Sequence, residues 1–314
     1  MSFLSTAVQQ VLDRGQFCAV ATMTPRGPHC TPLVFANSGT RIWLTTSRRS
    51  VKARAWRADA SAAGLVRDED LAVTFTGSVR TYDALDRRTW AAAVAGATSI
   101  ARATATFSAK NARFFAGYAL DAKQVPLAWT PPGRVFVGVD LERTALLDGH
   151  GVQEGRGRWG GDAGSHASFR NTAGADPMAA FPEDVVESIG RHGAGALALA
   201  GVRGLVVLPV RWRADAGALW AALPAETLTL AGAGADVEVA LTVDRSSVWR
   251  ARDMVGAMFQ GSASCFVEGA VDQGAKSMRT LAHAIAPDAT ALIRVRPRRV
   301  VWWRGWSSGN ADVA

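Results

Sequence analysis

The amino-acid sequence predicts a mainly β protein of the α+β type, built from two tandem barrels of antiparallel strands with flanking helices. Three observations support this prediction: short apolar segments joined by tight turns, a helical segment after the third strand, and an internal repeat relating the two halves of the chain. Closing five or six such strands into a barrel removes the exposed edges that they would otherwise present.

The first half begins with a helix and a three-stranded meander. Residues 3–14 carry apolar residues at helical spacing, and Gly15 is a suitable C-terminal stop. FCAVATMT, PHCTPLVF and TRIWLTT follow as strands, with turns at TPRG and ANSG. We expect a helix at residues 51–58, strands at AAGLV and LAVTFTGSVRTY, packing helices within residues 84–118, and a closing strand at residues 134–148.

The second half repeats the first at a constant offset of 209 − 32 = 177 positions. This offset pairs prolines, turn residues and tryptophans: Pro32 with Pro209, Arg26 with Arg203, Gly27 with Gly204, and Trp43 with Trp220. We therefore predict a first barrel at residues 1–154 and a degenerate second barrel at residues 183–314. Residues 155–182, rich in Gly, Ala, Ser and Pro, are interpreted as a linker.

Composition and charge argue against several classes of protein. The net charge is +8, but the arginines are scattered without a basic run, so we do not expect nucleic-acid binding. No apolar run approaches the ~18 residues of a membrane span, and the N-terminus lacks a signal-peptide core, which indicates a cytoplasmic protein. Cys18, Cys30 and Cys265 form no CxxC pair, and the histidines are isolated, so no disulfide framework or metal site is expected.

The segment TTSRRSVKARAW at residues 45–56 is the candidate phosphate-binding site. It combines several hydroxyl groups with Lys52, one of only four lysines, at the start of the expected helix. Hydroxyls, a cation and N-terminal helix amides are the groups that bind a phosphate monoester. The alternative interpretation is a capped, solvated helix start without a ligand.

The second copy of this segment has lost the groups that a phosphate needs. At offset 177, four positions change their chemistry: Thr46 becomes Leu223, Ser47 becomes Pro224, Ser50 becomes Thr227, and Lys52 becomes Thr229. The cation is gone, and the proline lacks an amide donor. We therefore expect one cofactor site per chain, in the N-terminal half.

These residues resemble the pyridoxamine 5′-phosphate oxidase-like family, the FMN-binding split β-barrels. The resemblance rests on one ordered series: Ala21-Thr22, Gly27-Pro28, Pro32-Leu33, then Thr46, Ser47, Ser50 and Lys52, and Gly77 in VTFTGSV. It implies two tandem split β-barrels with FMN as cofactor. Thr46, Ser50 and Lys52 would hold the phosphate with Ser47 beside them, and the backbone of Pro32, Leu33 and Val34 would border the flavin ring.

The resemblance also bears on assembly and activity. Members of the family form two-fold dimers around the cofactor, so a tandem chain could form an intramolecular pseudo-dimer, with a homodimer as the alternative. The chain departs from the oxidase itself because Val51 replaces an arginine and the strand at residues 31–35 lacks basic residues. We therefore expect a flavin-dependent oxidoreductase acting on an unidentified small molecule, with no catalytic residue that can be named.

Two alternatives to this function stay open. One is a reductase that uses the deazaflavin coenzyme F-420, and the other is a non-enzymatic carrier or sensor of flavin or haem. The tryptophans of VVWWRGW at residues 300–306 either cover the cofactor or pack an edge strand onto the barrel. For Arg48 and Arg49 we favour a position in water over one beside the phosphate. His29 is interpreted as a satisfied or exposed histidine rather than a catalytic one.

Overall fold

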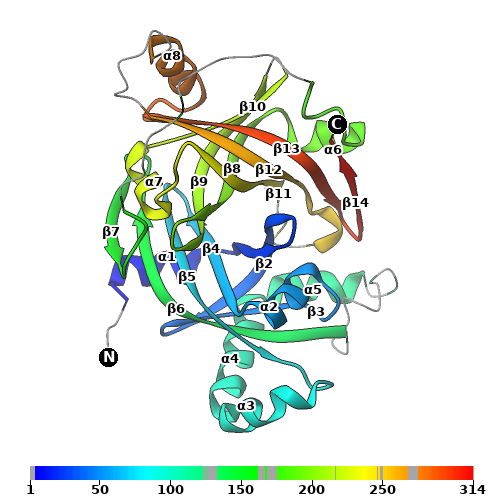
Figure 1. The fold of residues 1–314 in the computed structure, drawn as a ribbon. Helices are drawn as coiled ribbons and strands as arrows, with labels where there is room; N and C mark the ends of the chain where they lie inside the picture. The colour runs from blue at the N-terminus through cyan, green and yellow to red at the C-terminus, as the bar shows by residue number, and fades with distance from the viewer. Residues whose placement is uncertain are drawn as a thin grey trace.

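Two seven-stranded antiparallel sheets, each closed into a six-stranded barrel, dominate the computed structural model (Figure 1). In the first sheet the strand order is β3-β2-β1-β4-β5-β6-β7, and β3 pairs with β6 to close the ring. In the second the order is β10-β9-β8-β11-β12-β13-β14, and β10 pairs with β13. The predicted fold class is confirmed. The structure describes residues 4–121, 123, 125, 133–161, 167, 175–215, 217–245, 247, 250–267 and 275–313.

The first half of the chain contains the following elements, in order: α1 (Thr6–Arg14), β1 (Phe17–Thr24), β2 (Gly27–Ser38), β3 (Arg41–Ser47), α2 (Val51–Ala58), β4 (Ser61–Asp68), β5 (Leu71–Tyr82), η1 (Arg87–Thr89), α3 (Trp90–Ala95), α4 (Ala97–Lys110), α5 (Ala112–Leu120), β6 (Arg134–Leu147) and β7 (Val152–Arg156). The predicted strands and the helix at residues 51–58 are all present. The ANSG turn was placed too early, because β2 continues to Ser38 before the chain reverses.

The second half repeats this order: α6 (Glu183–Ile189), β8 (His192–Gly201), β9 (Gly204–Asp215), β10 (Ala218–Leu223), α7 (Ala225–Ala231), β11 (Asp236–Arg245), η4 (Ala251–Asp253), β12 (Val255–Val267), α8 (Ala275–Ile285), β13 (Ala291–Arg304) and β14 (Ser307–Asp312). The ends of β2 and β9 differ by 177 positions, as the repeat predicts. Gly27 and Gly204 open these strands with φ of 94° and 96°, a region that favours glycine.

A bulge at the same place in each barrel supports the repeat independently. The register of β5 against β6 shifts between Thr76 and Gly77, and that of β12 against β13 shifts between Gln260 and Gly261. A Cβ at Gly77 would lie 2.1 Å from the Asp140 carbonyl oxygen, and one at Gly261 would lie 2.1 Å from that of Arg296. Both bulges therefore require glycine.

The two barrels pack face to face within the chain, with the first (blue to green) below the second (yellow-green to red) in Figure 1. The Thr242 hydroxyl donates to the Cys30 carbonyl oxygen at 2.7 Å, and the Gln260 amide donates to the Pro28 carbonyl oxygen at 2.8 Å. One buried apolar cluster contains Leu65 of β4 and Leu197 of β8. The two barrels therefore contact each other within one chain; their action as an intramolecular pseudo-dimer around a cofactor and association into a homodimer both stay predictions.

The segment interpreted as a linker lies partly outside the described residues. Within it, the amides of Gly160 and Gly161 donate to the carbonyl oxygens of Leu230 and Thr229 at 3.0 and 2.9 Å. Phe181 packs into the core of the second barrel. Residues 162–166 and 168–174 of the linker are not described, so the predicted domain boundaries stay a prediction. Among the described helices, none has the length and apolar character needed to span a bilayer.

Candidate functional site

A pocket of about 310 Å³ lies between the two barrels, and we call it the Lys52 pocket. All seven cofactor-binding residues predicted from the sequence line it: Pro32, Leu33, Val34, Thr46, Ser47, Ser50 and Lys52. Pockets of this volume are of the size that takes small molecules and cofactors. The structure thus brings the predicted residues together, while their role in binding stays a prediction.

The turn between β3 and α2 presents its hydroxyls through a helix cap. Ser50 is the N-cap of α2, and its hydroxyl accepts a hydrogen bond from the Ala53 amide at 3.1 Å. The Thr46 hydroxyl donates to the Ser50 hydroxyl oxygen at 3.1 Å. Helix α2 therefore begins with a side-chain cap, as the alternative interpretation expected. It is compatible with a ligand site, because the same cap holds both hydroxyls at the wall of the pocket.

Lys52 is a nearly fully buried cation. It is 3% exposed, and its ammonium donates to the hydroxyl of Thr31 on β2. Burial lowers the pKa of Lys52 from 10.5 to about 8, and no aspartate or glutamate is among the described residues that line the pocket. A buried charge is strongly disfavoured unless an opposite charge and hydrogen bonds compensate it. The environment of Lys52 is therefore suited to an anionic ligand.

Arg48 does not point into water, as the sequence analysis favoured. Its Nε and Nη2 donate to the two carboxylate oxygens of Asp83, each at 2.7 Å, and Asp83 is itself buried. Neither Arg48 nor Arg49 is among the residues that line the pocket, and Arg49 is exposed. The expectation was thus wrong for Arg48, because it could not anticipate a carboxylate from the end of β5.

Arg134 is a second cation of the pocket and was missed by sequence reasoning. Its guanidinium donates to the hydroxyl and to the carbonyl oxygen of Thr45, both at 2.9 Å. Arg134 begins β6 and lies opposite Ser47 of β3. A closed barrel requires the third strand to pair with the last one. This pairing, applied to the sequence, would have placed Arg134 beside the turn between β3 and α2. Helix α5 adds Phe114 and Tyr118, for which the alanine-rich segment gave no positional signal.

The second barrel supplies the opposite wall of the Lys52 pocket. Trp303 and Trp306 line it, and the Trp306 ring lies edge-on to Tyr118 with centroids 5.1 Å apart. Trp302 points to the other face of β13 and lies 6.1 Å from the Phe181 ring. Trp302 therefore packs onto the barrel, as one interpretation expected, while the covering of a cofactor by Trp303 and Trp306 stays a prediction. Met254, between β11 and β12, also lines the pocket and was not anticipated.

His29 also lines the Lys52 pocket and is half-buried. No hydrogen bond joins its imidazole to another residue of the described chain, and the interpretation as a satisfied or exposed rather than catalytic histidine stays a prediction. Burial, with the charges of Lys52 and Arg299 nearby, lowers the pKa of His29 from 6.5 to about 3. The ring is therefore neutral near pH 7.

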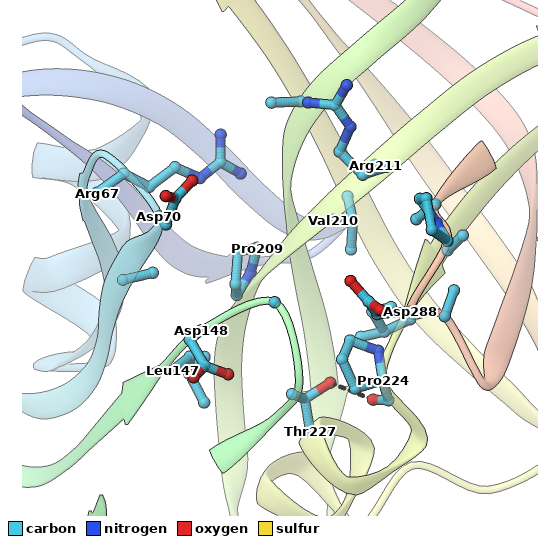
Figure 2. Close-up of a pocket in the computed structure, with 18 of the residues that line it drawn as sticks. Arg67, Asp70, Leu147, Asp148, Pro209, Val210, Arg211, Pro224, Thr227 and Asp288 are labelled. Carbon is cyan, nitrogen blue, oxygen red and sulfur yellow. Dashed lines mark hydrogen bonds between the residues drawn. The ribbon is translucent and has the colours of Figure 1, made fainter. Parts of the chain in front are cut away.

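A second pocket, of about 400 Å³, occupies the equivalent place on the other side of the pseudo-dimer, and we call it the Thr227 pocket (Figure 2). Eight of its residues match lining residues of the Lys52 pocket at offset 177: Ala194, Pro209, Val210, Arg211, Ala222, Leu223, Pro224 and Thr227. Figure 2 shows the Thr227 hydroxyl directed to the Pro224 carbonyl oxygen, to which it donates at 2.7 Å.

The chemistry of the Thr227 pocket differs from that of the Lys52 pocket. At the position of Lys52 stands Thr229, whose hydroxyl donates to the Glu226 carbonyl oxygen at 2.6 Å. Four acidic residues line the Thr227 pocket: Glu69, Asp70, Asp148 and Asp288. The hydroxyls of this turn are thus engaged by their own helix. That the second copy lacks a phosphate site of the same kind stays a prediction.

Comparison with known proteins gives one family match. Residues 4–125 match the family model described as pyridoxamine 5′-phosphate oxidase. No curated protein matches the chain significantly.

Several solved structures are similar to somewhat less than half of the chain. One is a conserved hypothetical protein from Mycobacterium tuberculosis, at 22% identity over 46% of this chain and 85% of that chain, with a TM-score of 0.33. Another is a pyridoxamine 5′-phosphate oxidase-related, FMN-binding protein from Nostoc punctiforme, at 18% identity over 46% and 85%, with a TM-score of 0.32. An F420 reductase matches at 19% identity over 45% and 98%, with a TM-score of 0.30.

Proposed function

The chain belongs to the pyridoxamine 5′-phosphate oxidase-like family through residues 4–125, and on this premise we propose that it binds FMN in the Lys52 pocket and acts as an oxidoreductase on a small organic molecule. One observation carries the proposal. Lys52 is a buried ammonium whose partner is a hydroxyl, in a pocket whose described lining contains no carboxylate. The phosphate of a mononucleotide would supply the missing negative charge.

The residues of the pocket fit such a cofactor. Lys52 and the Thr46–Ser50 hydroxyl pair lie at one turn, which would hold the phosphate. Phe114, Tyr118, Trp303 and Trp306 line the same pocket from both barrels. They would exclude water from an apolar ring and limit access to it. When bound, a flavin supplies hydride transfer, and this chain contributes the binding, the orientation and the exclusion of solvent.

Titration of the purified, cofactor-free chain with FMN, followed by flavin fluorescence, tests the binding. We expect one tight site, with the affinity lowered at least about tenfold in Lys52→Met, since a charged hydrogen bond contributes about 1.5–3 kcal/mol. Lys110→Met is the matched control. Lys110 is half-buried, but its ammonium donates to the Leu12 carbonyl oxygen at 2.7 Å and does not line the pocket. Equal FMN affinity in wild type and Lys52→Met would overturn the assignment.

Two further measurements address the cofactor and the activity. The absorbance spectrum of the chromophore that copurifies with the chain distinguishes FMN from the deazaflavin coenzyme F-420 and from haem. Bleaching of the bound chromophore by reduced nicotinamide, followed by reoxidation with a substrate, distinguishes an oxidoreductase from a carrier or sensor. A stable complex that no donor reduces would favour the carrier.

A further inference from the structure

We propose that the corner between β5 and α3, where Leu85, Trp90 and Val94 are exposed beside Arg87 and Arg88, docks onto an anionic lipid surface. We call these five residues the Trp90 corner. The inference does not depend on the proposed function, since none of the five lines the Lys52 pocket. It adds a partner, a bilayer with negatively charged headgroups, to a chain whose pockets indicate only small molecules.

Three large apolar side chains of the Trp90 corner face solvent. Leu85 and Val94 are 74% and 78% exposed, and Trp90 is 48% exposed. Trp90 and Val94 lie one turn apart on α3, so their side chains share a face of the helix. The Trp90 indole N–H donates to the Ala84 carbonyl oxygen at 3.1 Å, which holds the ring against the backbone next to Leu85. A cluster of exposed apolar side chains indicates an interaction site.

The backbone beneath the Trp90 corner is fixed by hydrogen bonds. The Thr89 hydroxyl donates to the carbonyl oxygens of Asp83 and Asp86 at 2.8 and 2.9 Å, and it accepts from the Asp83 amide at 3.1 Å. The Asp86 carboxylate caps η1 by accepting from the Arg88 amide at 3.1 Å. An ordered turn therefore holds the apolar side chains outward.

The exposed charges around the Trp90 corner are all positive. Between residues 84 and 110 the exposed charged side chains are those of Arg87, Arg88 and Arg102. None of these three guanidiniums forms an ion pair in the described part of the chain. Asp86 is the one acidic residue of this segment, and it is half-buried and engaged as the cap of η1. The corner thus combines apolar side chains with cations and has no exposed carboxylate.

These features select an anionic bilayer over a second copy of the chain. A two-fold pairing of the corner with itself would bring arginines together without a carboxylate between them. Tryptophan is enriched at the headgroup level of bilayers, and arginine is attracted to anionic headgroups. The Arg87 guanidinium lies 5.8 Å from the centre of the Trp90 ring, so both groups would meet the same layer of the bilayer.

The position of the corner also suits a flat partner. Figure 1 shows α3 at one end of the molecule, beyond the first barrel and far from the second. A planar surface can therefore approach Trp90 and Val94 without contacting the second barrel. Docking at this end also leaves the Lys52 pocket, which lies between the barrels, open to small molecules.

Sedimentation with lipid vesicles tests this docking. The purified chain is mixed with vesicles of phosphatidylcholine alone, or of equal parts phosphatidylcholine and phosphatidylglycerol, at low and at raised salt. The variants are Leu85→Asp, Trp90→Ala and Arg88→Gln, each checked for an unchanged thermal midpoint. Val202→Asp and Arg203→Gln are the matched controls, because Val202 is 71% exposed beside an exposed arginine in the turn between β8 and β9 of the second barrel.

We expect the chain to bind the vesicles that contain phosphatidylglycerol, to bind them less at raised salt, and to bind phosphatidylcholine alone only weakly. Leu85→Asp and Trp90→Ala should each lower the partition coefficient at least about tenfold, and Arg88→Gln about fivefold, while both controls keep the wild-type value. No binding to the anionic vesicles, or an equal loss in Val202→Asp, overturns the inference. Self-association that Trp90→Ala abolishes, without vesicle binding, would assign the corner to a second copy and overturns it as well.

Discussion

The guanidinium of Arg48 donates two hydrogen bonds of 2.7 Å to the carboxylate of Asp83. This bidentate pair ties the turn between β3 and α2, which carries the candidate phosphate site, to the segment that follows β5. The Arg48 amide also donates to the Gly133 carbonyl oxygen at 2.9 Å, just before β6. The phosphate turn is therefore fixed from both of these neighbouring segments, which favours a preformed site.

Asp83→Asn should destabilise the chain by about 2–3 kcal/mol, since it leaves a buried arginine contact without its opposite charge. The hydrogen bonds from Arg48 lower the pKa of Asp83 below its ordinary value of 3.8. The carboxylate thus contributes stability above about pH 3.8 that is lost as the pH falls through the lower, folded-state pKa. Urea unfolding of both proteins at several pH values measures this difference.

Asp86→Asn is the matched control for that prediction. Its carboxylate accepts a hydrogen bond from the Arg88 amide at 3.1 Å as the N-cap of η1, a role that asparagine fills equally well. It should therefore change the stability by less than about 0.5 kcal/mol. If both variants lose the same stability, the ion pair does not fix the turn.

Lys52→Met should stabilise the cofactor-free chain at neutral pH by about 1–3 kcal/mol, because it removes a buried charge whose pKa is lowered to about 8. Between about pH 8 and 10.5 the folded wild type releases this proton before the unfolded chain does, so its stability rises and the advantage of the variant shrinks. Thermal unfolding at paired pH values checks both statements. Stabilisation with loss of FMN binding is the signature of a ligand-binding residue.

Lys110→Met should not share this gain. Burial also lowers the pKa of Lys110 to about 8, but its ammonium donates to Leu12 and lies 3.7 Å from the centre of the Phe35 ring. Losing these contacts offsets the relief of burial. A wild-type chain that is more stable than Lys52→Met at neutral pH would indicate that Lys52 is a structural residue.

The affinity for FMN should fall by up to about tenfold per pH unit above about pH 8, because the cofactor-free Lys52 is then neutral and must take up a proton to pair with the phosphate. Below about pH 8 the lysine is already charged and this dependence should vanish. Fluorescence titration across the range measures it. In Lys52→Met the affinity for FMN should not change with pH above about pH 8. If the variant shows the same pH dependence as the wild type, the proton taken up on binding belongs to a group other than Lys52.

Trp303→Ala should weaken FMN binding by about tenfold, as expected for loss of one aromatic wall of the pocket. Trp302→Ala removes the neighbouring side chain on the opposite face of β13, which contacts Phe181. It should lower the thermal midpoint and leave the affinity for FMN unchanged. If Trp302→Ala weakened FMN binding and Trp303→Ala did not, the cofactor would lie outside the Lys52 pocket.

The sequence predicted the strands, the repeat and the lining of the candidate site, because these depend on local periodicity and on landmark residues such as Pro32 and Gly77. It did not predict contacts between segments that are distant along the chain. Arg134 contacts Thr45 because β3 and β6 pair to close the barrel. Asp83, just after β5, accepts hydrogen bonds from Arg48. Met254 of the second barrel lines the pocket.

The number of FMN molecules bound per chain tests the central claim most directly. The account predicts one, in the Lys52 pocket, because the equivalent turn in the second barrel carries Leu223, Pro224 and Thr229 instead of Thr46, Ser47 and Lys52. Equilibrium titration of the wild-type chain should thus saturate at one equivalent, and Lys52→Met should lower the affinity of that one site at least about tenfold. Saturation at two equivalents, or an unchanged affinity in Lys52→Met, would contradict the account.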